Sequence, residues 1–297
     1  MSYRLRVDEP VRRGLQRLAT TELKRARDDL RRAHPPHEHA IHEARKRLKK
    51  VDVIFRLVRD DGGGGTRGAA KRLRMLKHTL SPIRDADAMV VMLGTLKTRN
   101  PRLFGEHGFA RLRRQLSAHK RELLDQMTDD RVWQTVDRTL RRLRRMAKRW
   151  RTSHRSFAAV APAIRRTFRR GRNAMKRAMT RQRADDFHGW RKEMKSLWYE
   201  LRLIEMAGAA VRKDIHALHR AETWLGDHHN IVVLCNQLTR DVSERRAFDV
   251  DRLRLAADRY QAILEKQTLA AMRRFYGRDE DRYVDNLRRD WKRRRAA

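Results

Sequence analysis

The sequence predicts an all-α fold made of two similar antiparallel helical bundles around a basic central cavity. Hydrophobic residues recur with a helical period along almost the whole chain, and alternating β-branched runs are few. A pattern of basic residues as long as a helix begins at His42 and again at His188, 146 positions later, which indicates an internal duplication. The 297 residues suffice for one large domain or two ordinary ones, and 40% hydrophobic residues are enough for packed cores.

Each expected helix is a run of residues with helical spacing that is bounded by a break. In the first half we expect helices over residues 9–33, 40–60, 68–80, 82–98, 106–127 and 130–150. In the second half we expect helices over residues 157–181, 186–207, 209–225, 228–244, 248–276 and 279–294. Because helices and breaks follow the same order in both halves, a pseudo-two-fold axis is expected to relate the two bundles.

Prolines and glycines mark the breaks. His34-Pro35-Pro36 ends the first helix, because proline lacks the amide hydrogen and restricts the residue before it. Residues 61–65 form a glycine-rich turn, and Asn100-Pro101 forms a loop. Ser81 is expected to be the N-cap of a helix with Pro82 at its first position.

The duplication extends beyond the basic helices. Residues Leu80 to Asp85 correspond to residues Leu225 to Asn230 with an offset of 145, so one residue has been gained or lost. The best boundary between the halves is 151–156, which gives a first bundle over residues 1–152 and a second over residues 153–297.

The repeated pattern places five basic residues at the same offsets in both halves. They are His42, Arg45, Lys46, Lys49 and Arg56 in the first half, and His188, Arg191, Lys192, Lys195 and Arg202 in the second. At about 100° per residue, the five positions cover an arc of about 100° on a helix. The five positions keep their basic residues between the copies, whereas three positions off this arc change.

A hydrophobic seam lies roughly opposite this basic face on each helix. Its members are Ile41, Ala44, Leu48, Val51, Phe55 and Val58 in the first half, and Phe187, Trp190, Met194, Leu197, Leu201 and Ile204 in the second. Their alternating spacing of three and four residues is typical of a helix packed in a bundle.

The basic face has two interpretations, a solvated helix surface or an anion site. Its repetition favours the anion site, because drift on a neutral surface would have scrambled the charged positions. Arginine can hold two phosphate oxygens with its planar fork, and lysine adds a compact charge. A nearby polyanion raises the pKa of histidine, so we expect tighter binding at mildly acidic pH.

The net charge of +37 indicates a polyanionic partner, such as nucleic acid, inorganic polyphosphate or an acidic membrane surface. Aromatic residues make up only 6% and mostly occupy seam positions, and no helix-turn-helix or zinc-finger spacing occurs. A nucleic-acid-binding protein therefore stays the alternative hypothesis, and non-specific binding of DNA is expected at low salt. No run reaches the ~20 apolar residues that span a bilayer, and no secretory signal is visible, so we expect a cytoplasmic protein without a membrane partner.

The two basic helices, each followed by its second landmark at Leu80 or Leu225, resemble the paired motifs of the CHAD domain, the conserved-histidine α-helical domain. The resemblance covers roughly residues 5–295. It implies two helical bundles that face each other across a basic cavity or pore, with the ten repeated basic residues facing the ligand. It also implies binding of inorganic polyphosphate and association with polyphosphate granules. One departure is Asn230, where the family pattern has Asp, as at Asp85.

A further basic stripe is formed by Arg165, Arg169, Arg172 and Lys176 at positions i, i+4, i+7 and i+11. It is either an ordinary solvated face or a third wall of the same cavity. The tail beyond Trp291 is either another polyanion contact or a frayed end.

Other chemistry-bearing residues favour structural interpretations, so we expect a protein that is not an enzyme and holds no metal or cofactor. Asp85 and Asp87 lie in the first turn of a helix, where acids suit the dipole, and Asp85 is expected to pair with the basic face. The histidines at positions 34, 37, 39, 228 and 229 match no zinc spacing and are expected in loops. The glycines at 62–65 lack the P-loop ending, and Cys235 is expected to be a core thiol.

Overall fold

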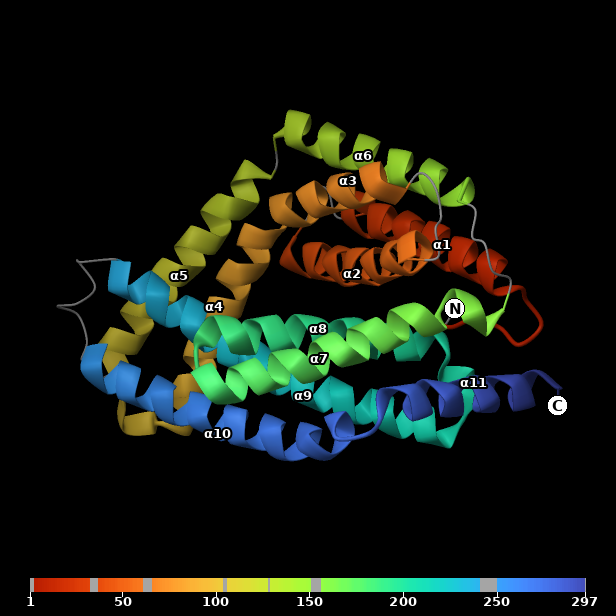
Figure 1. The fold of residues 1–297 in the computed structure, drawn as a ribbon. Coiled ribbons are helices and arrows are strands. Elements are labelled where there is room, and N and C mark those ends of the chain that lie inside the picture. The colour runs from red at the N-terminus through yellow and green to blue at the C-terminus, as the bar shows by residue number, and fades with distance from the viewer. Residues whose placement is uncertain are drawn as a thin grey trace.

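The computed structural model describes residues 3–32, 37–60, 66–103, 106–127, 129–150, 156–240 and 250–296. Every regular element in these ranges is a helix, as predicted (Figure 1). The first half contains α1 (Val11–Arg32), α2 (Glu38–Asp60), α3 (Thr66–Thr79), α4 (Ser81–Arg99), η1 (Pro101–Leu103), α5 (Glu106–Gln126) and α6 (Asp130–Lys148). The second contains η2 (Phe157–Ala159), α7 (Ala161–Arg181), α8 (Ala184–Leu203), η3 (Glu205–Ala207), α9 (Ala209–Arg240), α10 (Val250–Tyr276) and α11 (Glu280–Ala296).

Most predicted helices agree with these bounds to within a few residues. The breaks predicted at residues 34–36 and 61–65, and most of the boundary predicted at 151–156, lie outside the described residues. The loop predicted at Asn100-Pro101 is short, because Pro101 begins the 3-10 helix η1.

The two helices predicted over residues 209–225 and 228–244 are wrong as separate elements, since α9 runs unbroken from Ala209 to Arg240. Gly226 lies inside this helix and does not end it. Leu225 is buried in one hydrophobic core, whereas Ile231 and Leu234 are buried in a second one. Packing on both sides of the glycine therefore offsets its cost of about 1 kcal/mol in a helix interior.

The prediction that Ser81 is the N-cap of α4 is wrong, because Ser81 is the first residue of this helix. The cap position is occupied by Leu80, which makes no side-chain hydrogen bond to the helix start. The Ser81 hydroxyl instead donates to Asp85 at 3.2 Å.

Corresponding helices of the two halves pack in corresponding pairs. α1 packs on α2 and α6, while α7 packs on α8 and α11; α4 packs on α5, while α9 packs on α10. All twelve predicted seam residues of α2 and α8 are buried, which confirms the seams. The two basic helices α2 and α8 also contact each other, and Figure 1 shows them near the middle of the molecule.

A second core joins the halves away from these helices. It is built from α4, α5, α9 and α10, and its side chains include Leu93, Leu112, Leu234 and Leu264. Cys235 is half-buried against this core, and burial raises the pKa of its thiol to about 11.

Near the C-terminus, Trp291 of α11 is buried in the larger core. The residue that precedes the basic tail is therefore a packing residue.

Within the described part of the chain, none of the helices combines the length and hydropathy that crossing a bilayer requires.

Candidate functional site

A pocket of about 490 Å³ lies where α2, α3, α4, α8 and α9 meet. Its lining side chains carry an excess of positive charge, with eight lysines or arginines against two aspartates. The cations are Arg45, Lys49, Arg56, Lys77, Arg84, Arg191, Lys192 and Lys195, and the aspartates are Asp52 and Asp85. Ordinary helix amphipathicity creates this arrangement, because the buried seams of α2 and α8 turn their basic faces toward the same space.

Seven of the ten repeated basic residues line this pocket, namely Arg45, Lys49, Arg56, His188, Arg191, Lys192 and Lys195. His42, Lys46 and Arg202 do not. His42 and Lys46 are exposed, and Lys46 pairs with Glu43 at 2.8 Å. The Arg202 guanidinium lies over the Trp198 ring, 4.9 Å from its centroid, where cation–π attraction holds it.

The side chains of Arg165, Arg169 and Arg172 do not line this pocket; each pairs with an acid of α11. Arg165 pairs with Asp281 at 2.6 Å. Arg169 and Arg172 pair with Glu280 at 3.2 and 2.5 Å. Both acids lie in the first turn of α11, where the helix dipole also favours negative charge. These arginines hold α11 on α7.

Sequence reasoning missed Lys77, Arg84 and His229 as pocket residues. Arg84 and His229 are 145 positions apart, which is the offset of the second landmark, so the duplication already contained a signal for them. His229 was expected in a loop, but it lies on α9, and its neighbour His228 is buried with Nε2 2.8 Å from Glu265 Oε1.

The same kind of hydrogen bond, from a pocket arginine to a backbone carbonyl, occurs in both halves, and we call these two arginines the anchors. Arg45 Nη1 donates to the carbonyl oxygen of Lys77 at 2.8 Å, and Arg191 Nε donates to that of Glu222 at 3.1 Å. Residues 77 and 222 are again 145 positions apart. Backbone oxygens thus fix both guanidinium groups at the pocket without neutralising them.

Gly226 makes room for the second anchor. A Cβ atom at this position would lie 3.0 Å from Arg191 Nη2 and 3.2 Å from Nε. Gly226, which falls between the helices predicted over residues 209–225 and 228–244, therefore lets a nearly buried guanidinium lie against α9.

The α8–α9 side of the pocket carries its own counter-charge. Lys195 Nζ lies 2.8 Å from each carboxylate oxygen of Glu222, and Arg191 Nη2 lies 3.3 Å away. Burial by itself raises the pKa of Glu222, but Lys195 and Arg191 outweigh it and lower the pKa below its ordinary value. Glu222 is therefore ionised at neutral pH and partly neutralises both cations.

The α2 side differs at the corresponding lysine. Among the described residues no carboxylate lies within ion-pair distance of Lys49, the counterpart of Lys195. Burial and the nearby charges of Lys195 and Arg191 lower the pKa of Lys49 to about 6. Position 77 holds a lysine where Glu222 stands in the second half, and Lys77 Nζ pairs with Asp52 at 2.8 Å.

Two histidines close one side of the pocket. The His188 and His229 rings lie with centroids 4.0 Å apart and planes inclined by 32°. Burial, reinforced by nearby positive groups, lowers the pKa of His188 to about 3 and that of His229 to about 4. Both rings are therefore neutral at pH 7 and can act as hydrogen-bond donors through one ring nitrogen.

Asp85 pairs with the pocket residue Arg84, at 3.0 Å from Oδ1 to Nη1, and its negative charge partly offsets the lowering of the Arg45 pKa that burial causes. The corresponding residue is Asn230, whose Oδ1 is buried and accepts no hydrogen bond from the described residues. An amide cannot supply the charge of Asp85, so the halves differ here as well.

This chain belongs to the CHAD domain family, whose model matches residues 54–239, more than half of the chain. The match includes α8 and Arg56 but begins after the other repeated basic residues of α2. The fold is similar to the crystal structure of the CHAD domain from the plant Ricinus communis, with a TM-score of 0.62. That similarity covers 97% of this chain and 94% of the plant chain at 14% identity. No curated protein matches the sequence.

Proposed function

We propose that this chain binds inorganic polyphosphate in the pocket between α2 and α8, as a binding protein rather than an enzyme. The observation that carries the proposal is the charge of the pocket, where eight lysines or arginines face two aspartates. Glu222 adds a third carboxylate, paired with Lys195 and Arg191, so the basic residues still outnumber the carboxylates. The excess of positive groups is mutually repulsive, and partial burial removes the water that would screen them. An anion that contacts several of them at once offsets this repulsion.

The arrangement of donors suits a chain of phosphates. Arg45 and Arg191 are held by backbone oxygens, so each binds oxygens with little loss of side-chain freedom. Lys49 and Arg84 line the same pocket. A slender phosphate chain can contact these groups in succession, whereas a nucleic-acid duplex is too wide for a pocket of this volume. The CHAD family is associated with polyphosphate binding in general.

The proposal includes a pseudo-two-fold relation between the halves, with the pocket as the basic cavity between them. The paired anchors at residues 77 and 222, and the paired positions Arg84 and His229, support this relation. We further propose that the protein is cytoplasmic and associates with polyphosphate granules through this pocket.

Competition binding at near-physiological salt tests the function. Labelled long-chain polyphosphate competes with duplex DNA, RNA and short phosphates on the wild type and on Arg45→Glu/Arg191→Glu. We expect polyphosphate to bind at least about 100-fold more tightly than DNA, and the double variant to lose it, because two anchors of the pocket have reversed charge.

The matched control is Arg113→Glu/Arg114→Glu on α5, which makes the same charge change on two exposed residues outside the pocket. Arg84→Gln serves as a milder pocket variant if the double variant folds poorly. Equal competition by DNA, together with equal losses in the pocket and control variants, would instead support a diffuse basic surface and a nucleic-acid ligand.

A further inference from the structure

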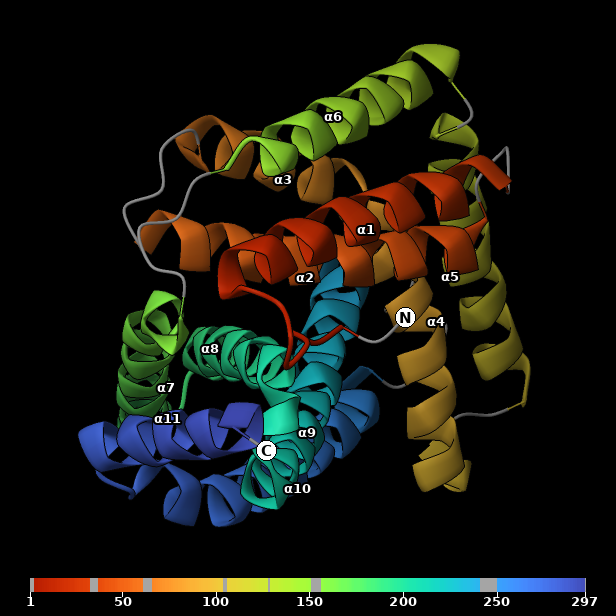
Figure 2. The same ribbon diagram turned by 90° about the vertical axis from the view of Figure 1, so that its right-hand side faces the viewer.

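A second pocket, of about 900 Å³, lies on another face of the molecule between α3 and α6. We call it the α3–α6 groove. Five cations line it, namely Lys71, Arg72, Arg131, Arg138 and Arg142, and no carboxylate does among the described residues. Figures 1 and 2 show α6 lying along α3 at one edge of the molecule.

The groove is separate from the polyphosphate pocket although both involve α3. Lys77 of α3 lines the pocket, and Met75 lines the groove. Two positions apart on an α-helix is a rotation of about 200°, so these side chains leave α3 on opposite sides. A ligand in one site therefore does not fill the other.

The groove combines its charge with an apolar centre. Met75 is 62% exposed, one of the most exposed large hydrophobic residues in the described part of the chain. Val132 of α6 is half-buried beside it, and Leu76 and Val136 are buried beneath. Met75 and Val132 thus form a small apolar centre within a basic rim, which apolar side chains of a partner would bury.

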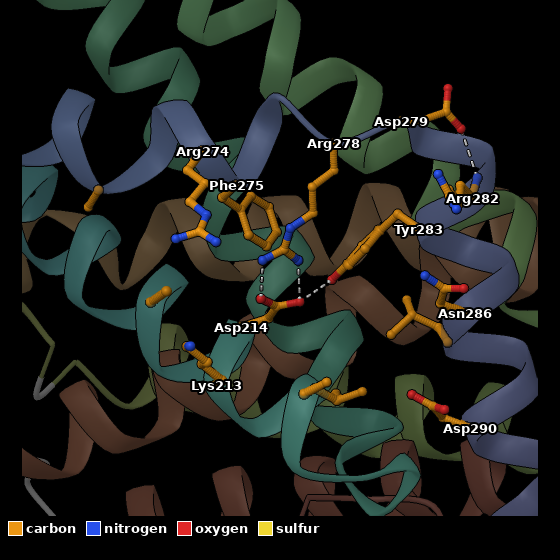
Figure 3. Close-up of a pocket in the computed structure, with 15 residues that line it drawn as sticks. Lys213, Asp214, Arg274, Phe275, Arg278, Asp279, Arg282, Tyr283, Asn286 and Asp290 are labelled. Carbon is orange, nitrogen blue, oxygen red and sulfur yellow. Dashed lines mark hydrogen bonds and ion pairs between the residues drawn. The ribbon is translucent and has the colours of Figure 1, made fainter.

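A pocket in the second half of the chain gives the contrast. It has a volume of about 640 Å³ and is lined by residues of α9, α10 and α11 (Figure 3). Asp214 accepts hydrogen bonds from Arg278 at 2.7 and 2.9 Å and from the Tyr283 hydroxyl at 3.0 Å. Asp279 and Asp290 add further negative charge to this lining. Four cations thus face three carboxylates in this pocket, whereas five cations face none in the α3–α6 groove.

We propose that the α3–α6 groove is the docking site for an acidic amphipathic helix of another protein. Such a helix would place apolar residues on Met75 and Val132, and its flanking carboxylates would meet the cations of both rims. A polyphosphate or nucleic-acid chain would satisfy the cations but leave Met75 in water. A second copy of this chain is a poor occupant, because its net charge of +37 repels the groove. Helix-in-groove recognition has this combination of apolar anchors and complementary charge.

A helical probe peptide tests the proposal by fluorescence anisotropy on the full chain. The peptide is about 20 residues long, as long as α6, with leucines at helical spacing and glutamates on the flanking positions. Its control has the same composition in an order that breaks the apolar stripe. We expect the striped peptide to bind at least about tenfold more tightly than the scrambled one, because only the stripe buries apolar surface on Met75.

Two variants with equal charge changes locate the site. Met75→Ser/Arg138→Glu alters the α3–α6 groove, and Leu255→Ser/Arg282→Glu alters an exposed hydrophobic residue and a cation of the second half. We expect the first variant to lose about tenfold in peptide affinity and the second to lose less than about twofold, with polyphosphate binding unchanged in both. All four side chains lie at the surface, and thermal unfolding checks that the variants stay folded.

Three results would overturn the proposal. Equal binding of the striped and scrambled peptides would show that charge alone attracts them. Equal losses in the two variants would place the peptide elsewhere. Binding to vesicles that contain anionic lipid, in competition with the peptide and lost in Met75→Ser/Arg138→Glu, would identify the groove as a membrane contact instead. Because polyphosphate binding is read separately, failure of this proposal leaves the proposed function standing.

Discussion

The two basic helices of the pocket carry the same residues but balance their charges differently. On the α8–α9 side, Glu222 lies 2.8 Å from Lys195 and 3.3 Å from Arg191, so these two cations are partly neutralised. On the α2–α3 side, the corresponding Lys49 lacks a carboxylate partner among the described residues, and position 77 holds a lysine in place of the glutamate. The α8–α9 side is therefore stabilised without a ligand, whereas the α2–α3 side has more to gain from one.

This difference is the basis for a proposed division of two tasks between the walls of the pocket. We propose that the ion pairs of Glu222 hold the α8–α9 wall in position, and that the α2–α3 wall, where Lys49 has no carboxylate partner among the described residues, supplies more of the binding energy. The two functions conflict within a single wall, because a carboxylate that fixes a lysine also competes with an incoming phosphate. Variants that change one wall at a time test this division.

The largest effect is expected from Glu222→Gln, which leaves Lys195 and Arg191 without their buried counter-charge. We expect the free energy of unfolding to fall by about 3 kcal/mol, measured by urea denaturation. Added polyphosphate should restore more stability to this variant than to the wild type, because the ligand takes the place of the carboxylate.

Asp52→Asn is the control on the other wall. The pair of Asp52 with Lys77 is more solvated, so its loss should lower the free energy of unfolding by less than about 1 kcal/mol. Equal losses in both variants would contradict the proposed division.

The two corresponding lysines should respond in opposite ways to replacement by methionine. Lys49→Met replaces a largely buried amino group that has no carboxylate partner among the described residues. We therefore expect the free energy of unfolding to rise by about 1–2 kcal/mol and polyphosphate to bind about tenfold more weakly. Lys195→Met breaks the pair with Glu222, so we expect lower stability and a smaller loss of affinity. Denaturation and binding isotherms on the same samples measure both effects. If Lys195→Met lost more affinity than Lys49→Met, the assignment of the binding wall would be reversed.

Polyphosphate affinity is expected to increase as the pH falls. Lys49 has a pKa of about 6 and is therefore mostly neutral at pH 7, and a bound polyanion raises this pKa, so binding takes up a proton. Protonation of Lys49 on binding therefore raises the affinity for polyphosphate by several-fold as the pH falls from about 8 toward 6, and below that pH its contribution levels off. His188 and His229, with pKa values of about 3 and 4, extend the increase to lower pH.

Calorimetric titration in two buffers of different ionisation enthalpy measures this proton uptake directly. The number of protons taken up on binding at pH 7 should be lower for Lys49→Met and unchanged for Arg113→Glu/Arg114→Glu. Binding without any proton uptake would mean that Lys49 already carries its charge in the free protein.

The smallest effect is expected from Gly226→Ala. Alanine favours the helix by about 1 kcal/mol, but its Cβ would lie 3.0 Å from Arg191 Nη2 and must displace that guanidinium. We therefore expect unchanged or higher thermal stability with about threefold weaker polyphosphate binding. Gly94→Ala is the matched control, since no atom lies within 4 Å of a Cβ placed there. Loss of affinity in both variants would show that the effect does not pass through Arg191.

The sequence predicted most of the helices and the buried seams because these depend on local periodicity. It also predicted seven residues of the pocket, because the basic face repeats at the same offsets on both helices; that the two faces meet depends on how α2 and α8 pack. It failed where a neighbouring helix decides the outcome. Periodicity shows that Arg169 and Arg202 lie on exposed faces, but not that Glu280 or the Trp198 ring lies next to them.

What the sequence by itself determined is the all-α class, the family and the basic face of two corresponding helices. Only the tertiary structure decided that α9 continues through Gly226, because packing of Leu225 and Ile231 in two cores outweighs the local weakness of glycine. It also decided which cations are neutralised. The single glutamate at position 222 has no counterpart in the repeated motif, and its distance to Lys195 and Arg191 depends on how α8 and α9 pack. Electrostatic pairing between helices is a property of three-dimensional distance, which spacing along one chain does not contain.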